Sequence, residues 1–318
     1  MNTDARIYVA GHRGLVGSAI TRRLRSLGYN NLILRSSSEL DLRDMGQVER
    51  FFRTERPEYV FLAAAKVGGI LANSTYPAEF IRDNLAIQTN VIHYAYLNNV
   101  RKLLFLGSSC IYPKHAPQPM QEEHLMSGYL EPTNEPYAIA KIAGLKMCEF
   151  YNRQYGTDFV SVMPTNIYGI EDNFDLQTSH VLPALIRKFA EAKQNNQPTV
   201  ELWGSGTPRR EFLFSDDLAD ACVYLINQPD ASNHGLINIG AGVDITIFEL
   251  AQLIGEIVGY TGEIVFDSTK PDGALRKLLD VSKLTAMGWT ATTLLREGIK
   301  QTYDWYCDKC KEQPGMTL

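Results

Sequence analysis

The stretch RIYVAGHRGLVGSAI, residues 6–20, decides the fold class of this chain. A short apolar run is followed at once by Gly11, Gly14 and Gly17 and then by an amphipathic segment. At a turn between a buried strand and a helix, glycines let the backbone approach a pyrophosphate, and free N–H groups and the helix dipole attract the anion. A plain glycine-rich turn is the alternative, but the strand-turn-helix context favours dinucleotide binding.

Apolar runs alternate with amphipathic stretches through the first 165 residues. Short buried strands are predicted at 6–10, 31–34, 59–64, 103–108 and 159–164, with helical patterns between them. Parallel strands need crossover connections, which are nearly always right-handed. This rhythm therefore predicts an α/β fold built on a Rossmann-like, doubly wound parallel sheet.

The rhythm breaks after about residue 168, which predicts a smaller α/β domain for the substrate. A strand with its turn at 235–242 and a helix at 247–258 indicate that the chain returns to the first domain before it finishes elsewhere. We therefore expect a discontinuous division into a nucleotide-binding domain, 1–168 plus about 213–258, and a substrate-binding domain, about 169–212 plus 259–318.

The charge balance limits the class of partner. The chain has 31 lysines and arginines against 36 aspartates and glutamates, a net charge of −5, which disfavours nucleic acid but leaves room for a local basic pocket. No segment reaches the ~18 apolar residues of a membrane span, and the acidic and basic residues near the start do not resemble a signal peptide. We expect a cytoplasmic protein with no membrane partner.

The cysteines indicate reduced thiols rather than a disulfide framework. They are odd in number and lie mostly in apolar runs, at positions 110, 148, 222, 307 and 310. Cys307 and Cys310 form a CxxC pair, but no second CxxC or histidine pair stands at zinc spacing. We expect no metal site.

The end of the second predicted strand indicates which dinucleotide binds. An acidic residue there accepts the ribose 2′-hydroxyl of NAD, whereas arginine accommodates the 2′-phosphate of NADP. This chain has Arg35 followed by Ser36, Ser37 and Ser38, and Arg13 in the glycine loop adds a second guanidinium. NADP(H) is the predicted cofactor; the alternative is that both arginines are solvated surface charges.

A tyrosine and a lysine share one face of a predicted helix. The helix is capped by Thr133 or Asn134 and ends at Gly156, and it places Tyr137 four residues before Lys141. At that spacing the two Cβ atoms lie ~6 Å apart, and the ammonium favours the phenolate. Tyr137 is therefore a candidate proton donor, although the same spacing also occurs where a lysine merely packs over a ring.

A serine and a cysteine follow the fourth predicted strand. Ser108 and Cys110 would share one face if the chain stayed extended there, at the edge where doubly wound sheets bind ligands. Ser108 can donate a hydrogen bond to a substrate oxygen that Tyr137 protonates. Together with Lys141 these residues predict a carbonyl-reduction site.

The chain resembles the extended short-chain dehydrogenase/reductase family over essentially its whole length. Five segments carry the resemblance: GHRGLVG at 11–17, AAAKVGGI at 63–70, GSSCIYP at 107–113, EPTNEPYAIAKIAG at 131–144 and MPTNIYG at 163–169. The family's usual threonine before the loop is replaced by Ala10, which touches none of the loop glycines. The segments are most similar to a subgroup that epimerises a GDP-4-keto-6-deoxy-sugar at C3 and C5 and then reduces C4 with NADPH.

The resemblance implies a role for each catalytic residue. Cys110 would be the epimerisation base and His180 the acid, with the Cys110 thiolate stabilised by neighbours such as His180 or by the sugar site itself. Ser108 and Tyr137 would hold the C4 oxygen, while Lys141 would bind the nicotinamide ribose and lower the pKa of Tyr137. From the residues alone, Cys110 and His180 are more often packing residues.

The resemblance also implies the binding residues. The NADPH site would comprise Gly11, His12, Arg13, Gly14, Leu15, Val16, Gly17, Arg35, Ser36, Ser37, Ser38, Glu39, Leu40, Ala63, Ala64, Leu106, Gly107, Ser109, Pro164, Thr165, Asn166 and Ile167. The GDP-sugar would contact Lys188, Trp203, Arg210 and Asp280. The helix that carries Tyr137 and its neighbour commonly form a homodimer in this family.

Two other functions stay open. A nucleotide-sugar 4-epimerase or 4,6-dehydratase on the same scaffold would keep its NAD(P) bound, and Arg13 and Arg35 disfavour that choice. A non-enzymatic dinucleotide sensor would use the same fold, because fold alone does not fix function. Such a sensor predicts a broken catalytic set, whereas Ser108, Tyr137 and Lys141 are all present.

Overall fold

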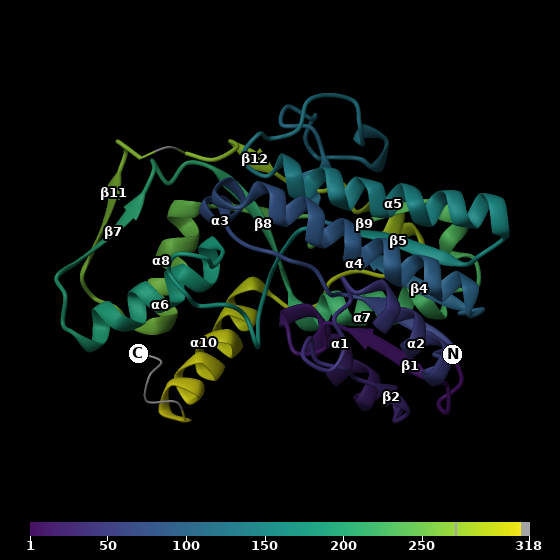
Figure 1. The fold of residues 1–318 in the computed structure, drawn as a ribbon. Helices are drawn as coiled ribbons and strands as arrows, with labels where there is room; N and C mark the ends of the chain where they lie inside the picture. The colour runs from purple at the N-terminus through teal and green to yellow at the C-terminus, as the bar shows by residue number, and fades with distance from the viewer. Residues whose placement is uncertain (271, 313–318) are drawn as a thin grey trace.

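A six-stranded parallel sheet forms the centre of the computed structural model, which describes residues 1–270 and 272–312 (Figure 1). Its strand order is β2-β1-β3-β4-β5-β9. The strands are β1 (Ile7–Ala10), β2 (Leu32–Ile33), β3 (Tyr59–Leu62), β4 (Lys102–Leu106), β5 (Phe159–Pro164) and β9 (Leu236–Ile239). Every neighbouring pair is parallel, and each predicted strand is present, so the sheet expected from the sequence is confirmed.

Helices cover both faces of this sheet, as a doubly wound fold requires (Figure 1). One face packs against α1 (Leu15–Ser26) and α7 (Ser215–Asn227), and the other against α2 (Met45–Glu55), α4 (Pro77–Leu97) and α5 (Glu135–Tyr155). The strands are buried almost completely because apolar residues point to both faces. The predicted helix before Gly156 is α5, and Gly156 ends it in the left-handed region at φ 67°.

A second group of elements lies beside the sheet and has its own apolar core (Figure 1). Its strands are β6 (Asn166–Tyr168), β7 (Thr199–Trp203), β8 (Arg209–Phe214), β10 (Asp244–Thr246), β11 (Glu263–Asp267) and β12 (Arg276–Lys277). Strand β8 pairs with β6, β10 and β12, while β7 pairs with β11. The helices of this group are α6 (Val181–Gln194), α8 (Ile247–Val258) and α10 (Leu295–Glu312).

Short helices complete the described chain. They are α3 (Ile70–Thr75), α9 (Ser282–Ala286) and the 3₁₀ turns η1 (Ser109–Ile111), η2 (Glu122–His124) and η3 (Ala231–His234). Across residues 1–270 and 272–312, the search for a helix with the length and hydropathy of a membrane span finds none.

The packing of α8 bears on the expected division into domains. Leu250, Ala251 and Ile254 of α8 join the core that contains α6, rather than the cores on the large sheet. We therefore propose that 247–258 belongs with the substrate-binding group, while 213–240, which includes α7 and β9, stays with the sheet. Residues 271 and 313–318 of the predicted second domain lie outside the described residues.

Candidate active site

The glycine loop lies where the strand order reverses, between β1 and β3. Gly11 has φ +82°, and a Cβ on Gly17 would stand 2.1 Å from the Gly11 carbonyl oxygen, so both positions require glycine. A Cβ on Gly14 would meet only that same oxygen, at 3.6 Å. Helix α1 begins at this loop with no acidic residue in its first turn and no side-chain cap, so its N–H groups face the site unoccupied by a carboxylate. The loop fits a dinucleotide pyrophosphate.

Two arginines gather at the end of β2, as the sequence predicts for a 2′-phosphate site. Arg13 and Arg35 both act on the Glu39 carboxylate and lower its pKa, after the larger effect of hydrogen bonds from Ser36. Ser36 donates to Glu39 from its backbone N–H at 2.7 Å and from its hydroxyl at 2.6 Å. Arg35 also pairs with Glu55, 2.5 Å away. Arg13 and Arg35 thus both lie within electrostatic reach of Glu39, and Arg35 is also paired with Glu55.

Ala63, Ala64, Leu106, Gly107, Pro164 and Thr165 lie at or just after the ends of β3, β4 and β5, which meet with the end of β1 at one edge of the sheet. Ala63 and Ala64 lie against Gly11, whose added Cβ would meet the Ala64 backbone at 2.9 Å. Thr165 and Asn166 donate their side-chain hydrogen bonds to the Glu211 carbonyl oxygen, at 3.3 and 2.7 Å. The Leu40 side chain belongs to the apolar core, so only its backbone can face a ligand.

Lys141 is buried at the inner face of α5. Its ammonium donates a 2.8 Å hydrogen bond to the Leu106 carbonyl oxygen and lies 4.9 Å from the centre of the Phe105 ring and 5.7 Å from that of Tyr137. Burial lowers the pKa of Lys141 to about 8. The predicted pairing of Tyr137 with Lys141 on one helix face is therefore present.

The phenol of Tyr137 is partly buried, next to Ser108. We expected the neighbouring ammonium to favour the phenolate, but Lys141 is not among the groups that shift the pKa of Tyr137. Burial raises the pKa of Tyr137, the Cys110 thiol raises it further, and only a hydrogen bond with Ser108 lowers it. The phenol therefore keeps its proton across the neutral range, which suits a proton donor.

Ser108 and Cys110 meet through a turn. The chain does not stay extended after β4, because Ser109–Ile111 form a 3₁₀ turn with Ser108 as its N-terminal residue. The condition for the alternation, an extended chain, is therefore not met, yet the turn still brings the Ser108 hydroxyl into hydrogen-bonding reach of the Cys110 thiol. Burial raises the pKa of that thiol, while Ser108, Lys277 and Lys141 lower it.

His180 occupies the N-cap position of α6 and makes no side-chain capping bond. His180 as a residue is exposed, but neighbouring protein atoms crowd its imidazole, and this partial loss of water lowers its pKa. The expectation that His180 stabilises the Cys110 thiolate finds no support in the charges around the thiol, because the groups that lower the pKa of Cys110 include Lys277 and Lys141 and not His180.

The predicted substrate residues differ in their exposure and in the hydrogen bonds that they already make within the protein. Arg210 on β8 lies opposite Lys277 on β12. Trp203 is 69% exposed at the end of β7, and Lys188 donates to the Glu201 carbonyl oxygen at 3.3 Å. The Asp280 carboxylate already accepts hydrogen bonds from Ser282 N at 2.9 Å and from Gln121 Nε2 at 3.1 Å.

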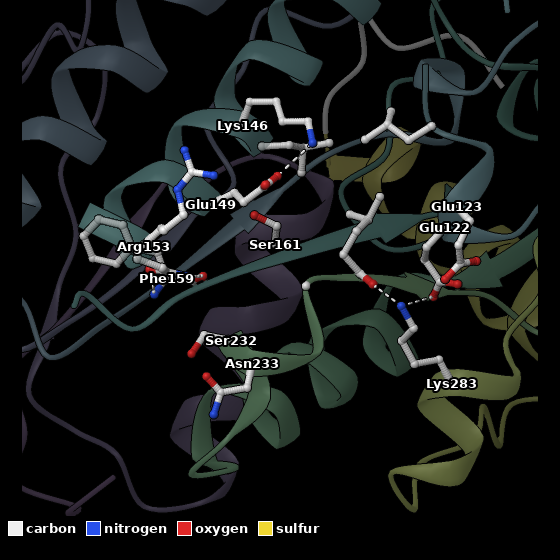
Figure 2. Close-up of a pocket in the computed structure, with 15 residues that line it drawn as sticks. Glu122, Glu123, Lys146, Glu149, Arg153, Phe159, Ser161, Ser232, Asn233 and Lys283 are labelled. Carbon is white, nitrogen blue, oxygen red and sulfur yellow. Dashed lines mark hydrogen bonds and ion pairs between the residues drawn. The ribbon is translucent and has the colours of Figure 1, made fainter. Parts of the chain in front are cut away.

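A separate pocket of about 600 Å³ lies at the opposite edge of the sheet (Figure 2). It is lined by Phe159 and Leu236, the first residues of β5 and β9. Two lysines of its lining have partners within the pocket: Lys146 lies 2.8 Å from Glu149, and Lys283 lies 3.8 Å from Glu122 and donates to the Leu236 carbonyl oxygen at 2.9 Å. None of the five predicted catalytic residues lines this pocket, so it is distinct from the candidate active site.

Residues 7–240 match the NAD dependent epimerase/dehydratase family. The chain belongs to this family. It is 61% identical to a putative GDP-L-fucose synthase 2 from Arabidopsis thaliana over 97% of this chain and 93% of that protein. It is 56% identical to GDP-L-fucose synthase from Escherichia coli (strain K12) over 95% of this chain and 97% of that protein.

A solved enzyme structure has the same fold. A GDP-mannoheptose C4 reductase from Campylobacter jejuni with NADP bound matches with a TM-score of 0.90 and 43% identity, over 96% of this chain and 99% of that chain. The family assignment made from the sequence motifs is therefore confirmed.

Two residues of the site were missed by sequence reasoning. Glu211 on β8 is 0% exposed, and its carboxylate accepts hydrogen bonds from Gly242 N at 2.7 Å and Leu279 N at 3.0 Å. Lys277 on β12 lies within electrostatic reach of Cys110. Neither belongs to a motif that indicates burial, and both reach the site through pairings between distant segments.

Proposed function

We propose that this chain converts GDP-4-keto-6-deoxy-D-mannose to GDP-L-fucose with NADPH, by epimerisation at C3 and C5 followed by reduction at C4. The observation that carries the proposal is the convergence of Ser108, Cys110 and Tyr137, each within interaction distance of another, beside the buried ammonium of Lys141. The relatives at 61% and 56% identity are named as synthases of this product.

The two charged parts of NADPH, the pyrophosphate and the 2′-phosphate, would each meet a matching part of the cofactor site. Gly11, Gly14 and Gly17 would hold the pyrophosphate at the start of α1, and Arg13 and Arg35 would hold the 2′-phosphate. Ala63, Ala64, Gly107 and Thr165, at the ends of the neighbouring strands, would line the rest of the cofactor site. When bound, NADPH supplies the hydride that is added to C4.

One oxyanion site serves both reactions in this proposal. In two separate rounds, one at C3 and one at C5, the Cys110 thiolate removes the proton, and the electron pair moves onto the C4 oxygen as an enolate. Ser108 and Tyr137 hold that oxygen by hydrogen bonds, and His180 returns a proton to the opposite face of the carbon. Between the rounds the Cys110 thiol releases its proton and His180 takes one up, both by exchange with solvent. During reduction Tyr137 gives its proton to the same oxygen, because hydride addition also leaves negative charge there.

The nucleotide part of the substrate would meet positive charge in the second group of elements. Arg210 and Lys188 would neutralise the GDP pyrophosphate, and the exposed ring of Trp203 would offer an apolar surface. Asp280 would contact the substrate only if it exchanged its present partners, Ser282 and Gln121.

We also propose that the chain is a homodimer and that it works in the cytoplasm. Helices α4 and α5 pack together and present exposed apolar side chains, including Leu97 at 53%, Phe150 at 45% and Tyr155 at 45%. Such faces are commonly covered by a partner subunit. All five cysteines are free, which suits a reducing compartment.

A C4 reductase that does not epimerise is the second candidate, because the solved relative with bound NADP is named a C4 reductase. The purified chain should be incubated with GDP-4-keto-6-deoxy-D-mannose and NADPH, following the loss of nicotinamide absorbance and the configuration of the product sugar. Oxidation of NADPH with formation of GDP-L-fucose supports the proposal. If NADPH is not consumed, both candidates fail.

A further inference from the structure

Strand β12 carries a lysine into the candidate active site from a distant part of the chain. Lys277 pairs with Arg210 in the parallel register of β12 with β8, so the two cationic side chains lie on the same face. The next residues are fixed by backbone hydrogen bonds: Leu278 N donates to Gln118 Oε1 at 2.9 Å, and Leu279 N donates to Glu211 Oε2 at 3.0 Å. The segment is thereby held between β8 and the loop that follows η1.

The ammonium group of Lys277 has no hydrogen bond or ion pair with the residues that the structure describes. Three ionisable groups act on it: the Cys110 thiol, Arg210 and Glu131. Glu131 is already paired with Lys114 at 3.1 Å. Crowding by protein atoms lowers the pKa of Lys277, and Arg210 lowers it further.

Among the described residues Lys277 has no paired anion of its own: Glu131 is paired with Lys114, and Asp272 acts on Arg210. Holding a crowded ammonium beside a guanidinium costs free energy unless a negative charge compensates it. Among the groups that act on Lys277, the Cys110 thiol is the one that can gain a negative charge and has no cationic partner at contact distance. The ammonium of Lys141 also acts on Cys110, but it already donates to the Leu106 carbonyl oxygen.

We propose that Lys277 is a positioning residue that stabilises the Cys110 thiolate and so prepares the base that epimerises the substrate. This inference rests on the proposed function for the role of Cys110. The thiolate would be surrounded by Lys277, Lys141 and the Ser108 hydroxyl, with the Tyr137 phenol close by. Burial opposes the charge, and the nearby cations offset part of that cost.

The test measures the thiolate without any substrate. The full-length protein, loaded with NADP, is alkylated with iodoacetamide between pH 6 and 10, and the Cys110 peptide is quantified by mass spectrometry. Because only the thiolate reacts, the rate below the pKa follows its population. Lys277→Met should slow alkylation of Cys110 by about tenfold at fixed pH, equivalent to a rise of about one pKa unit. Lys277→Arg should restore most of the rate.

A matched control is available on the same strand. Arg276→Met also removes one positive charge, but Arg276 pairs with Asp244 on β10 and should leave Cys110 alkylation unchanged. Lys277→Gln provides a second neutral variant, and NADPH binding together with the thermal unfolding temperature verifies that each variant folds.

The outcomes separate this inference from the proposed function. If Lys277→Met and Lys277→Gln alkylate like the wild type, the inference is wrong; a raised KM with an unchanged alkylation profile would assign Lys277 to the substrate phosphates instead. Solvent deuterium exchange at C3 and C5 should fall about tenfold in Lys277→Met, matching the alkylation rate. Failure of the wild type to exchange these protons would overturn the function but would leave the alkylation result standing.

Discussion

The ammonium of Lys141 donates a 2.8 Å hydrogen bond to the carbonyl oxygen of Leu106, the last residue of β4. This bond joins the helix that carries Tyr137 to the strand that leads into Ser108, so the two hydroxyl groups proposed to hold the substrate oxygen are positioned together. Lys141 therefore both fixes α5 against β4 and places a positive charge beside the phenol of Tyr137.

The pH dependence of reduction should report the charge on Lys141. Burial lowers its pKa to about 8, so the ammonium is present below that pH and is lost above it. We expect kcat/KM for reduction, which reports the free enzyme, to fall about tenfold per pH unit above about pH 8. A pH-rate profile from 6 to 10 measures this, and a flat profile through pH 9.5 would contradict the role of the charge.

Cys110→Ser should impair epimerisation while NADPH binding stays near normal. A serine hydroxyl is a far weaker acid than a thiol, so we expect proton exchange at C3 and C5 to slow by at least about a hundredfold. Exchange into the substrate in deuterated water is the measurement. Cys148→Ser is the matched control, because Cys148 is buried on the same side of the sheet but interacts with Ser161 rather than with Ser108. Weakened NADPH binding with normal proton exchange at C3 and C5 would contradict the assignment of Cys110 as the epimerisation base.

Two glycines of the loop should respond differently to alanine. Gly17→Ala places a Cβ 2.1 Å from the Gly11 carbonyl oxygen, so the backbone must move, and we expect the free energy of unfolding to fall by at least about 2 kcal/mol. Gly14→Ala meets that oxygen at 3.6 Å, so the fold should tolerate it, while NADPH affinity falls because the methyl group faces the pyrophosphate. Chemical unfolding and NADPH titration test both variants; equal stabilities would refute this explanation.

Arg35→Met should change the choice of cofactor. Removing one guanidinium from the 2′-phosphate site should weaken NADPH binding by about tenfold or more and leave NADH binding unchanged. Fluorescence titration with both cofactors gives the ratio of dissociation constants. Arg43→Met, which removes an arginine paired with Asp41, is the control. Equal losses for NADPH and NADH would show that Arg35 acts on the fold and not on the phosphate.

Phe150→Glu should disrupt the proposed dimer. Phe150 is 45% exposed on α5, and a carboxylate there would be desolvated at an interface between two copies. Light scattering coupled to gel filtration should show a monomer at concentrations where the wild type is a dimer. Phe248→Glu changes an equally exposed phenylalanine, 45%, on α8 and should leave the dimer intact. A wild-type protein that elutes as a monomer would disprove the assembly.

The large sheet could be predicted from the sequence because its strands are continuous apolar runs flanked by turns. The glycine loop and the pairing of Tyr137 with Lys141 followed in the same way, since each depends on spacing within one element. The protonation states of the site residues could not be predicted from the sequence. Burial, which no local pattern reports, raises the pKa of Tyr137 against the expected effect of Lys141.

Residues that reach the site because strands distant in the sequence pair with each other could not be predicted either. Lys277 comes within electrostatic reach of Cys110 on β12, which pairs with β8 in a parallel register, and a two-residue strand carries no periodic signal. The turn after Ser108 could not be predicted, because GSSC continues an apolar strand without a glycine or proline after Gly107. Helix α8 was predicted with the right bounds, but its packing partner α6 was not.

Reaction in deuterated water tests the central claim most directly, because epimerisation exchanges protons and reduction alone does not. The chain is incubated with GDP-4-keto-6-deoxy-D-mannose and NADPH in D₂O, and the product is examined by NMR. We predict GDP-L-fucose with deuterium at both C3 and C5. A product that retains the D-manno configuration at these carbons, with hydrogen at both, would contradict the account and identify a simple C4 reductase.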